Sequence, residues 1–234
     1  MSQRFFVDQP IADQTLVTLS GPEAHHLARV MRGQVGDEVV LFDGCGREYR
    51  AKIEQLGRRD VELTITECSE LESPSERPLT LAVALPKGDR QKWLVEKAVE
   101  LGVARLQPLH TERSVAKTNS AVIDRLRRAA VEASKQCGRN WLMEILPPAE
   151  FSVWLNPTGY DQRWLAHPTG GRPLERGQRV PGAATIGVGP EGGFSDGEVT
   201  MATEAGCRLL SLGRHTLRVE TAALAAAAQW EQWE

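Results

Sequence analysis

A glycine-rich stretch near the end of the chain, GVGPEGGFSDGE, has the residue types of a loop that holds a phosphorylated or nucleotide ligand. Its glycines form the pattern G-x-G-x-x-G at Gly187, Gly189 and Gly192. In dinucleotide-binding proteins this spacing lets the backbone approach a pyrophosphate closely. An apolar stretch precedes the loop, and Ser195 with Glu198 forms the S-x-x-E capping box of a following helix. The sequence therefore predicts a strand, a ligand-binding loop and a helix.

Three features of the sequence oppose a dinucleotide site. Only about 42 residues follow Gly192, whereas a dinucleotide fold carries this loop after its first strand, with several strand–helix units to come. The acidic residue expected about 20 positions further on is absent. Glu191 stands inside the loop, where a carboxylate would repel a pyrophosphate. A dinucleotide-dependent oxidoreductase of the NAD type stays as an alternative.

A second glycine-containing loop, SLGRHTLRVETA at residues 211–222, follows the next apolar stretch, RLLSLG. Glycines allow main-chain amides and carbonyls to come close to a ligand. A pair of such loops on neighbouring strands suits a compact adenosine-containing ligand that is recognised through main-chain hydrogen bonds. The bland alternative is that the glycines only make tight turns.

The elements that must position these loops fall into two parts. The polar, proline-containing stretch SELESPSERP at 69–78 predicts a linker, so we expect a first domain over 1–70, a linker over 71–78 and a second domain over 79–234. The first part contains alternating strands and one helix at about 22–32, which indicates a small β-barrel. The second alternates short apolar strands with helices, which is typical of an α/β domain with a mainly parallel sheet covered on both faces.

Composition narrows the class of protein. The chain has 234 residues, 41% of them hydrophobic and 25% charged, and a net charge of −3. No apolar run reaches the roughly 20 residues of a membrane helix, and the N-terminus has no export signal. The cysteines are scattered and form no C-x-x-C pair: Cys45, Cys68, Cys137 and Cys207. We therefore expect a cytoplasmic protein with no membrane partner, no bound metal and no disulfide framework.

The two loops together carry a family resemblance. GVGPEGGFSDGE followed by SLGRHTLRVETAALAA resembles the cofactor signature of the SPOUT RNA methyltransferases, and more narrowly of the RsmE family, which methylates N3 of a uridine in 16S ribosomal RNA. The resemblance covers nearly the whole chain, because several upstream segments match in the same order: RFFVD, HHLARVMRGQVGDEVVLFDG, LPKGDRQKWLVEKAVELGV, PLHTERSVAK and EASKQCGR.

The resemblance implies an N-terminal PUA-like small β-barrel that binds RNA and a C-terminal SPOUT α/β domain with a deep trefoil knot. It implies S-adenosyl-L-methionine, bound in a bent form, as cofactor. It implies a homodimer that acts on ribosomal RNA, in an assembled or assembling small ribosomal subunit. The cofactor-binding residues that it implies are Leu165, His167, Gly187, Gly189, Pro190, Glu191, Gly192, Gly193, Leu212, Gly213, Leu217 and Arg218.

Three residues are candidates for the chemical step. Arg218 is the first, because an arginine presents a permanently charged fork of donors to charge that develops on the uracil oxygens. The alternative for Arg218 is a structural ion pair with Glu191 or Glu220. Glu191 could accept a proton, hold a cofactor group or only brace the knot. Arg139 could reach the cleft of a partner subunit.

Contacts to RNA are expected from basic residues in both domains: His26, Arg29, Arg32, Arg113 and Arg128. His25 and His26 are adjacent, so they cannot face the same side of a helix; one should pack and the other face RNA. A basic run over 125–139 could also serve RNA or be an ordinary solvated helix face. A non-catalytic RNA-binding protein, built on the barrel alone, is a further alternative.

The last helix offers a candidate dimer surface. Trp230 and Trp233 lie three residues apart, so they share a helical face, and an exposed tryptophan face would mark a contact. Packing of this face inside the monomer is the alternative.

Overall fold

The computed structural model describes residues 3–116, 118–156, 159–169, 171–173 and 182–231. The chain divides into two compact units: one of Met1–Pro74 with Ser134–Leu142, the other of Ser75–Ala133 with Met143–Glu234. The predicted second domain over 79–234 differs from this division, because a short segment from its middle packs with the first unit. Asn140 shows why, since its side-chain oxygen accepts a hydrogen bond from Arg4 at 2.7 Å.

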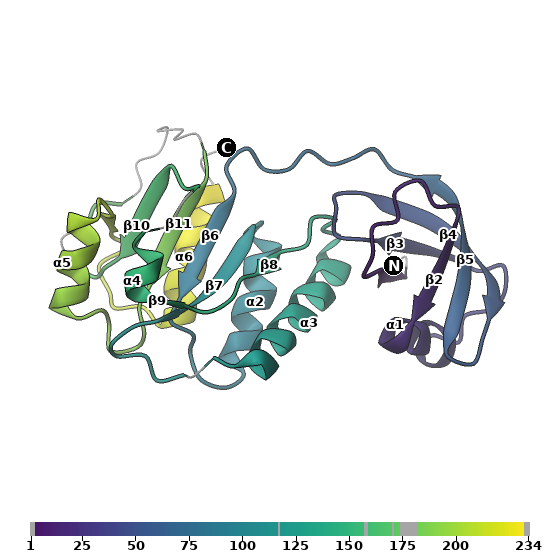
Figure 1. Ribbon diagram of the computed structural model, residues 1–234, viewed down its shortest axis with the longest axis horizontal. Coiled ribbons are helices and arrows are strands. Elements are labelled where there is room, and N and C mark those ends of the chain that lie inside the picture. Colours follow the sequence, from purple (N-terminus) through teal and green to yellow (C-terminus); the bar gives the residue numbers. More distant parts are fainter. Residues whose placement is uncertain (1–2, 117, 157–158, 170, 174–181, 232–234) are drawn as a thin grey trace. The chain divides into compact units, whose positions relative to one another are not determined.

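The first unit is a five-stranded curled sheet with one helical segment (Figure 1). The strand order is β1-β3-β4-β5-β2. The strands are β1 (Arg4–Phe6), β2 (Leu16–Ser20), β3 (Glu38–Phe42), β4 (Glu48–Leu56) and β5 (Asp60–Cys68). Strand β1 runs parallel to β3, and the other pairs are antiparallel. The helical segment is α1 (Gly21–His25), continued by the π-helical turn η1 (His26–Val30).

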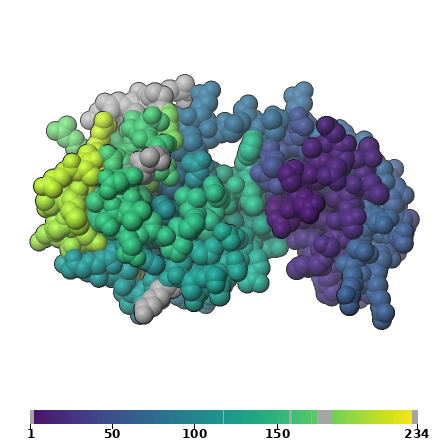
Figure 2. All heavy atoms as spheres, in the orientation of Figure 1, coloured from purple at the N-terminus to yellow at the C-terminus, as the bar shows by residue number. Residues whose placement is uncertain are grey.

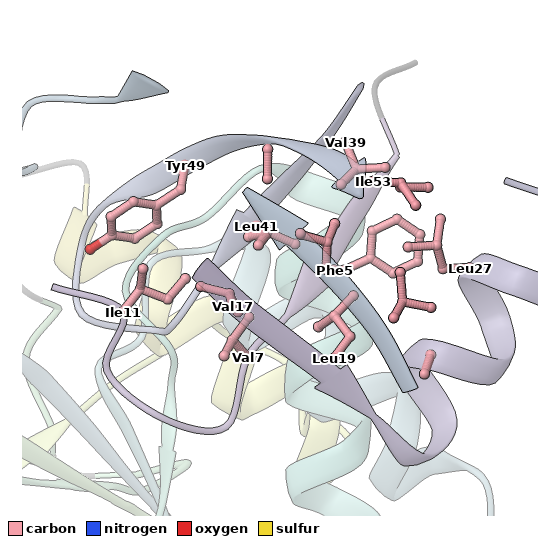
Figure 3. Close-up of a cluster of buried hydrophobic side chains, with 14 residues drawn as sticks. Phe5, Val7, Ile11, Val17, Leu19, Leu27, Val39, Leu41, Tyr49 and Ile53 are labelled. Atoms are coloured by element: carbon pink, nitrogen blue, oxygen red, sulfur yellow. The ribbon is translucent and has the colours of Figure 1, made fainter. Parts of the chain in front are cut away.

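Alternation of side chains builds the core of this unit. In β4, Tyr49, Ala51 and Ile53 are buried while the residues between them face outward, as the period of two in a strand requires. Figure 3 shows Phe5, Leu41, Val17, Leu19 and Leu27 converging between the curled sheet and the helix. The predicted small β-domain with one helix is confirmed.

The second unit is built on a parallel sheet in the order β12-β10-β11-β6-β7-β8, with β9 also paired to β7. The strands are β6 (Leu79–Val83), β7 (Arg105–His110), β8 (Glu144–Ile145), β9 (Ala149–Glu150), β10 (Gln162–Ala166), β11 (Ala184–Val188) and β12 (Arg208–Leu210). Every residue of β6 and β11 is buried, which requires cover on both faces of the sheet. The predicted parallel α/β sheet is confirmed.

Helices provide that cover (Figure 1). They are α2 (Arg90–Glu100), α3 (Ser120–Cys137), α4 (Phe151–Trp154), α5 (Asp196–Glu204) and α6 (Val219–Glu231). Helix α6 packs on α2 and on the central strands β6 and β11, whereas α5 contacts β12. The atoms of α5 lie at the surface of this unit (Figure 2). The trefoil knot that the family resemblance implies stays a prediction.

The expected dimer surface on α6 is not formed by Trp230. Its side chain is 1% exposed inside the monomer. The indole Nε1 donates to the carbonyl oxygen of Arg77 at 3.0 Å, and the Arg77 guanidinium lies 4.4 Å from the ring centroid. Trp233 lies outside the described residues. The prediction of an exposed tryptophan face was therefore wrong for Trp230, because the end of α6 is held against the chain just before β6.

Candidate cofactor-binding and active site

A cavity of about 250 Å³ opens in the second unit at the carboxyl ends of three adjacent strands. Its lining comes from residues 166–168 at the end of β10, from residues 188–194 at the end of β11 and after it, and from seven of the residues between 212 and 222 after β12. Parallel strands end at one edge of a sheet, and ligands of α/β proteins bind outside those ends. The volume is just below the roughly 300–1,000 Å³ that small-molecule sites usually have.

The cavity brings together most of the predicted cofactor residues. Those that line it are His167, Gly189, Pro190, Glu191, Gly192, Gly193, Leu212, Gly213 and Leu217. The lining residues that sequence reasoning missed are Ala166, Pro168, Val188, Phe194, His215, Thr216, Val219 and Ala222. Most of these are small or apolar side chains beside the predicted ones, so their signal was only their position within the two loops.

Leu165, Gly187 and Arg218 are not part of the lining. Leu165 is fully buried in the sheet core. Gly187 lies inside β11, where an added Cβ would stand 2.7 Å from the ring of Trp154. This glycine is needed for side-chain packing, because a real Cβ does not approach another heavy atom so closely. The predicted ligand role of Leu165 and Gly187 therefore finds no support in the geometry.

Two lining glycines have conformations that other residues resist. Gly193 has a φ of +68° and Gly213 a φ of +136°, both on the left-handed side. A Cβ at either position would meet no protein atom within 4 Å, so it would project into open space. Gly192 differs, because it has no left-handed φ and an added Cβ would rest on the Arg113 side chain at 3.5 Å. The loops thus present bare backbone at Gly193 and Gly213.

The glycine loop is held from below by the loop after β7. The Arg113 guanidinium donates to the carbonyl oxygen of Gly192 at 2.9 Å. The buried carboxylate of Glu198 accepts the backbone N–H of Glu112 at 2.9 Å and that of Ser195 at 2.8 Å. Ser195 Oγ in turn accepts the N–H of Glu198, which completes the predicted capping box. The loop is therefore a fixed element of the structure.

Arg90, which sequence reasoning missed, bridges the two loops of the cavity. Its Nη2 donates to Glu191 Oε1 at 2.9 Å, and its Nη1 lies 3.5 Å from Glu220 Oε2. Glu220 is 6% exposed, and its Oε2 has no hydrogen bond although the guanidinium is within range of charge attraction. One arginine at the start of α2 therefore neutralises a carboxylate of each loop. The sequence alone suggested Arg218, and not Arg90, as the ion-pair partner of Glu191 or Glu220.

Arg218 is exposed at the end of the second loop. Within the described part of the chain it has no ion-pair partner, and Glu191 and Glu220 are both taken by Arg90. The alternative of a structural ion pair for Arg218 therefore fails. A guanidinium beside the cavity with no internal partner is available to a substrate.

The residues predicted to contact RNA have different surroundings. His26 is the packed member of its pair, since its ring lies 5.8 Å from that of Phe5, whereas His25 is exposed. Arg29 is exposed in the same helical segment, and Arg32 is exposed two residues after the segment ends at Val30. Arg113 has the internal role described above. The contact of His26 with Phe5 and the exposure of His25 thus favour His25 as the histidine that faces a ligand.

The basic run on α3 is largely engaged within the protein. Arg125 donates to Gln91 at 2.6 Å, Arg127 lies 3.4 Å from Asp124, and Lys135 lies 3.0 Å from Glu23. Arg128 is exposed. Arg139 belongs to the first unit and does not line the cavity. Contacts of Arg128 and Arg139 with RNA stay predictions.

A cysteine nucleophile does not serve this site. Cys207, just before β12, is buried against the core that includes Phe151 and Phe194. Burial raises the pKa of its thiol, although the nearby Arg163 opposes the shift. A thiol of this kind packs and does not react. Across the described residues no group of three or more His, Cys, Asp or Glu side chains is placed to hold a metal ion. No helix among them is long and apolar enough to cross a membrane.

The N-terminus of α5 decides against a pyrophosphate. In dinucleotide-binding folds that helix end is free to meet the phosphates. Here the capping box of Ser195 and Glu198 occupies it, and the first turn carries the carboxylates of Asp196 and Glu198. Comparison with known families agrees. The model of the RNA methyltransferase domain family matches residues 73–231, and that of the RNA methyltransferase PUA domain matches residues 19–66. This chain belongs to the RNA methyltransferase domain family.

Two relatives of this RNA methyltransferase share one name. A Synechocystis protein named ribosomal RNA small subunit methyltransferase E is 33% identical over 98% of this chain and 77% of its own. A Bacillus subtilis protein of the same name is 27% identical over 95% of this chain and 93% of its own. The family resemblance that the two loops indicated is therefore confirmed.

Two solved structures share the fold of this RNA methyltransferase over nearly its whole length. A Legionella pneumophila methyltransferase in complex with SAM is 30% identical, with a TM-score of 0.90 over 98% of this chain and 97% of its own. The ribosomal RNA small subunit methyltransferase E of Neisseria gonorrhoeae, bound to S-adenosyl methionine, is 29% identical. Its TM-score is 0.88 over 97% of this chain and 96% of its own.

Proposed function

We propose that this protein transfers a methyl group from S-adenosylmethionine to N3 of one uridine in small-subunit ribosomal RNA. The observation that carries the proposal is the cavity between two glycine-containing loops, in a chain of the RNA methyltransferase family. The names of the relatives support the ribosomal substrate, and the neighbours solved with the cofactor support S-adenosylmethionine. The uridine N3 position follows from the resemblance to the RsmE family.

The residues of the cavity fit this cofactor. Apolar side chains from both loops, such as Phe194 of the first and Leu217 of the second, give a surface for a flat aromatic base. Bare backbone at Gly193 and Gly213 leaves room for a ligand to approach main-chain groups. Glu191 also lines the cavity, and its carboxylate is paired with Arg90 at 2.9 Å. When bound, S-adenosylmethionine supplies an electrophilic methyl group on a sulfonium centre.

Residues of the chain must then stabilise the uracil as its N3 atom is methylated. Its N3 carries a proton at neutral pH. That proton must pass to solvent before or during methyl transfer, and its loss leaves negative charge on the flanking oxygens. We assign Arg218 to those oxygens, because an exposed guanidinium without an internal partner can donate to them as charge develops. We assign Glu191 to bracing of the loop, since Arg90 already holds it at 2.9 Å. A contribution of Arg139 from a second copy of the chain stays part of the proposal.

We also propose that the working unit is a cytoplasmic homodimer that meets its RNA in an assembled or assembling small subunit. All four cysteines are free, as a reducing compartment requires. Trp230 is buried in the monomer and therefore does not support a dimer surface. The support for the dimer is the family resemblance. Light scattering at micromolar concentration should give twice the monomer mass. A monomer that keeps full methylation activity at nanomolar concentration would contradict a required dimer.

Cofactor choice distinguishes the competing functions. Calorimetry of the full chain should show saturable heat with S-adenosylmethionine or its demethylated product, and none with a nicotinamide dinucleotide. Since the ligand binds only the folded state, a hundredfold excess over its dissociation constant should raise stability by about 2.7 kcal/mol. Heat with the nicotinamide dinucleotide alone would support the oxidoreductase. RNA binding without any cofactor heat would support the non-catalytic protein.

A further inference from the structure

The first unit contains a second concave site, which no motif of the sequence marks. It is a groove of about 460 Å³ between the helical segment α1–η1 and the turn that joins β4 to β5. Its polar lining includes His25 and Arg29 on the helical wall, and Arg58, Arg59 and Asp60 on the turn. We call it the barrel groove. It lies entirely within the first unit.

The sequence builds the two walls of the groove in a defined way. His25 and Arg29 are four residues apart in the helical segment, so they share a face, and both are exposed. On the other wall, the backbone N–H of Gly57 donates to the carbonyl of Asp60 at 2.9 Å and closes the turn. An added Cβ at Gly57 would lie 1.9 Å from Asp60 Oδ1 and 3.0 Å from the Asp60 carbonyl oxygen, so the Asp60 side chain would have to move. The turn therefore presents Arg58 and Arg59 at its tip.

Pairing of strands holds the walls together. Ser20, the residue before α1, pairs with Asp60 at the start of β5 in the antiparallel register of β2 and β5. The helical wall and the turn are thus anchored at neighbouring positions of one sheet. A groove fixed in this way is preformed.

Charge gives the groove its character. It holds three arginines against the single carboxylate of Asp60. Within the described residues, Arg29, Arg58 and Arg59 have no ion-pair partner. By contrast, two basic residues of the adjacent strand β4 are matched: Arg50 with Glu67 at 3.3 Å and Lys52 with Glu38 at 3.7 Å. Three arginines with no ion-pair partner among the described residues therefore gather where the surface of this unit is hollow.

We propose that the barrel groove binds the phosphate backbone of the RNA substrate. Arginine matches phosphate geometry with a planar fork of donors, and a concave basic surface holds successive phosphates of one strand. The inference rests on the proposed function, because it takes RNA as the polyanion. It changes the expected set of contacts: His25, Arg58 and Arg59 join Arg29, whereas Arg32 and the packed His26 do not line the groove.

Counterion release sets the size of the effect. Each phosphate contact contributes about 0.7 to the slope of log affinity against log salt for single strands and about 0.9 for duplexes. Between 1 M salt, where this contribution vanishes, and 0.1 M salt, one contact is therefore worth roughly 5- to 8-fold in affinity. Loss of two contacts should weaken RNA binding by roughly 25- to 60-fold at 0.1 M and lower the slope by about 1.4–1.8.

The test compares two double variants of the full chain that lose the same charge. Arg58→Ala with Arg59→Ala empties the turn wall, and Arg50→Ala with Lys52→Ala removes two paired charges from the same unit. Affinity for a small-subunit RNA fragment is measured from 0.05 to 0.4 M salt, and cofactor affinity by calorimetry. We expect the predicted loss and slope change for the first variant only, with less than threefold change for the second. Cofactor affinity should stay unchanged in both.

Further arms guard the result against misfolding and against a general charge effect. Arg29→Ala on the opposite wall should lower the slope by about 0.7–0.9 without touching the turn. Arg58→Lys with Arg59→Lys should restore most of the slope, since the charges return. Equal losses in both double variants, or none in either, would overturn the groove while leaving the proposed function intact. A wild-type protein that binds the cofactor but no RNA at any salt would overturn both.

Discussion

Arg90→Ala should weaken cofactor binding, although Arg90 does not line the cavity. The guanidinium bridges Glu191 of the first loop and Glu220 in the first turn of α6, directly after the second loop. Without it, the two loops lose their shared partner, and Glu220 keeps a buried carboxylate with no counter-ion. The cavity should then be less well ordered in the absence of ligand. Part of the binding free energy would be used to order the two loops, so the measured affinity should fall.

The structure bounds the magnitude. The Arg90–Glu191 pair joins side chains that are 37% and 42% exposed, so solvent screening limits it to about 0.2–1 kcal/mol. The Glu220 side chain is only 7% exposed, and breaking a fully buried pair costs about 3–5 kcal/mol. Because Arg90 itself is 37% exposed, we expect about 1–2 kcal/mol from this pair. The total loss of unfolding free energy should be about 1–3 kcal/mol.

Calorimetry with S-adenosylmethionine and thermal unfolding without it measure the two consequences. If 1–2 kcal/mol of the loss appears in binding, the dissociation constant should rise about 5- to 30-fold. Lys92→Ala is the matched control, because Lys92 lies on the same helix in an exposed pair with Glu96 at 3.6 Å. Arg90→Lys should recover only part of the affinity, since an ammonium cannot span both carboxylates. A folded Arg90→Ala variant whose cofactor affinity matches that of Lys92→Ala would refute the bridging role.

Three further changes test the same site. Glu198→Ala removes an acceptor of two backbone N–H groups and should lower the unfolding free energy by about 2–4 kcal/mol. The control Asp196→Asn should lower it by only about 0.3–1 kcal/mol. Similar melting curves for the two variants would contradict the capping role of Glu198. Gly193→Val should leave a folded protein with little cofactor affinity, since a β-branched residue resists the φ of +68° at this lining position. The control Gly197→Ala, inside α5, should bind the cofactor normally. Calorimetry that shows equal cofactor affinities for the two variants would mean that the loop is only a turn. Arg218→Ala should lower methyl transfer by about 10²–10³-fold with nearly unchanged cofactor affinity, and equal losses in both would reassign Arg218 to cofactor binding.

The sequence predicted the architecture well where local patterns decide it. Alternating side chains identified β4, and the S-x-x-E pattern placed the start of α5 at Ser195. The two loops and most of the cavity lining followed from glycine spacing and from the family resemblance. Such features depend on residues close together in the chain, and a single sequence displays them directly.

Long-range contacts were outside the reach of these patterns. Arg90 is 101 residues from Glu191, so nothing in the helical pattern of α2 distinguishes it from the neighbouring charges. Trp230 was expected to be exposed. Its partner Arg77 is 153 residues away in the chain, so the pattern of the last helix could not reveal the contact that buries it. Gly187 looked like a ligand-binding glycine, whereas the ring of Trp154 explains it. In each case the deciding partner comes from another element of the fold.

Mass mapping of 16S ribosomal RNA from a strain that lacks this protein tests the central claim most directly. The account predicts that one uridine loses a single methyl group on its base-pairing edge. It also predicts that purified protein with S-adenosylmethionine restores the methyl group to that nucleotide in isolated small subunits or in their RNA. An unchanged methylation pattern in the deletion strain, together with no methyl transfer by the purified protein, would contradict the account.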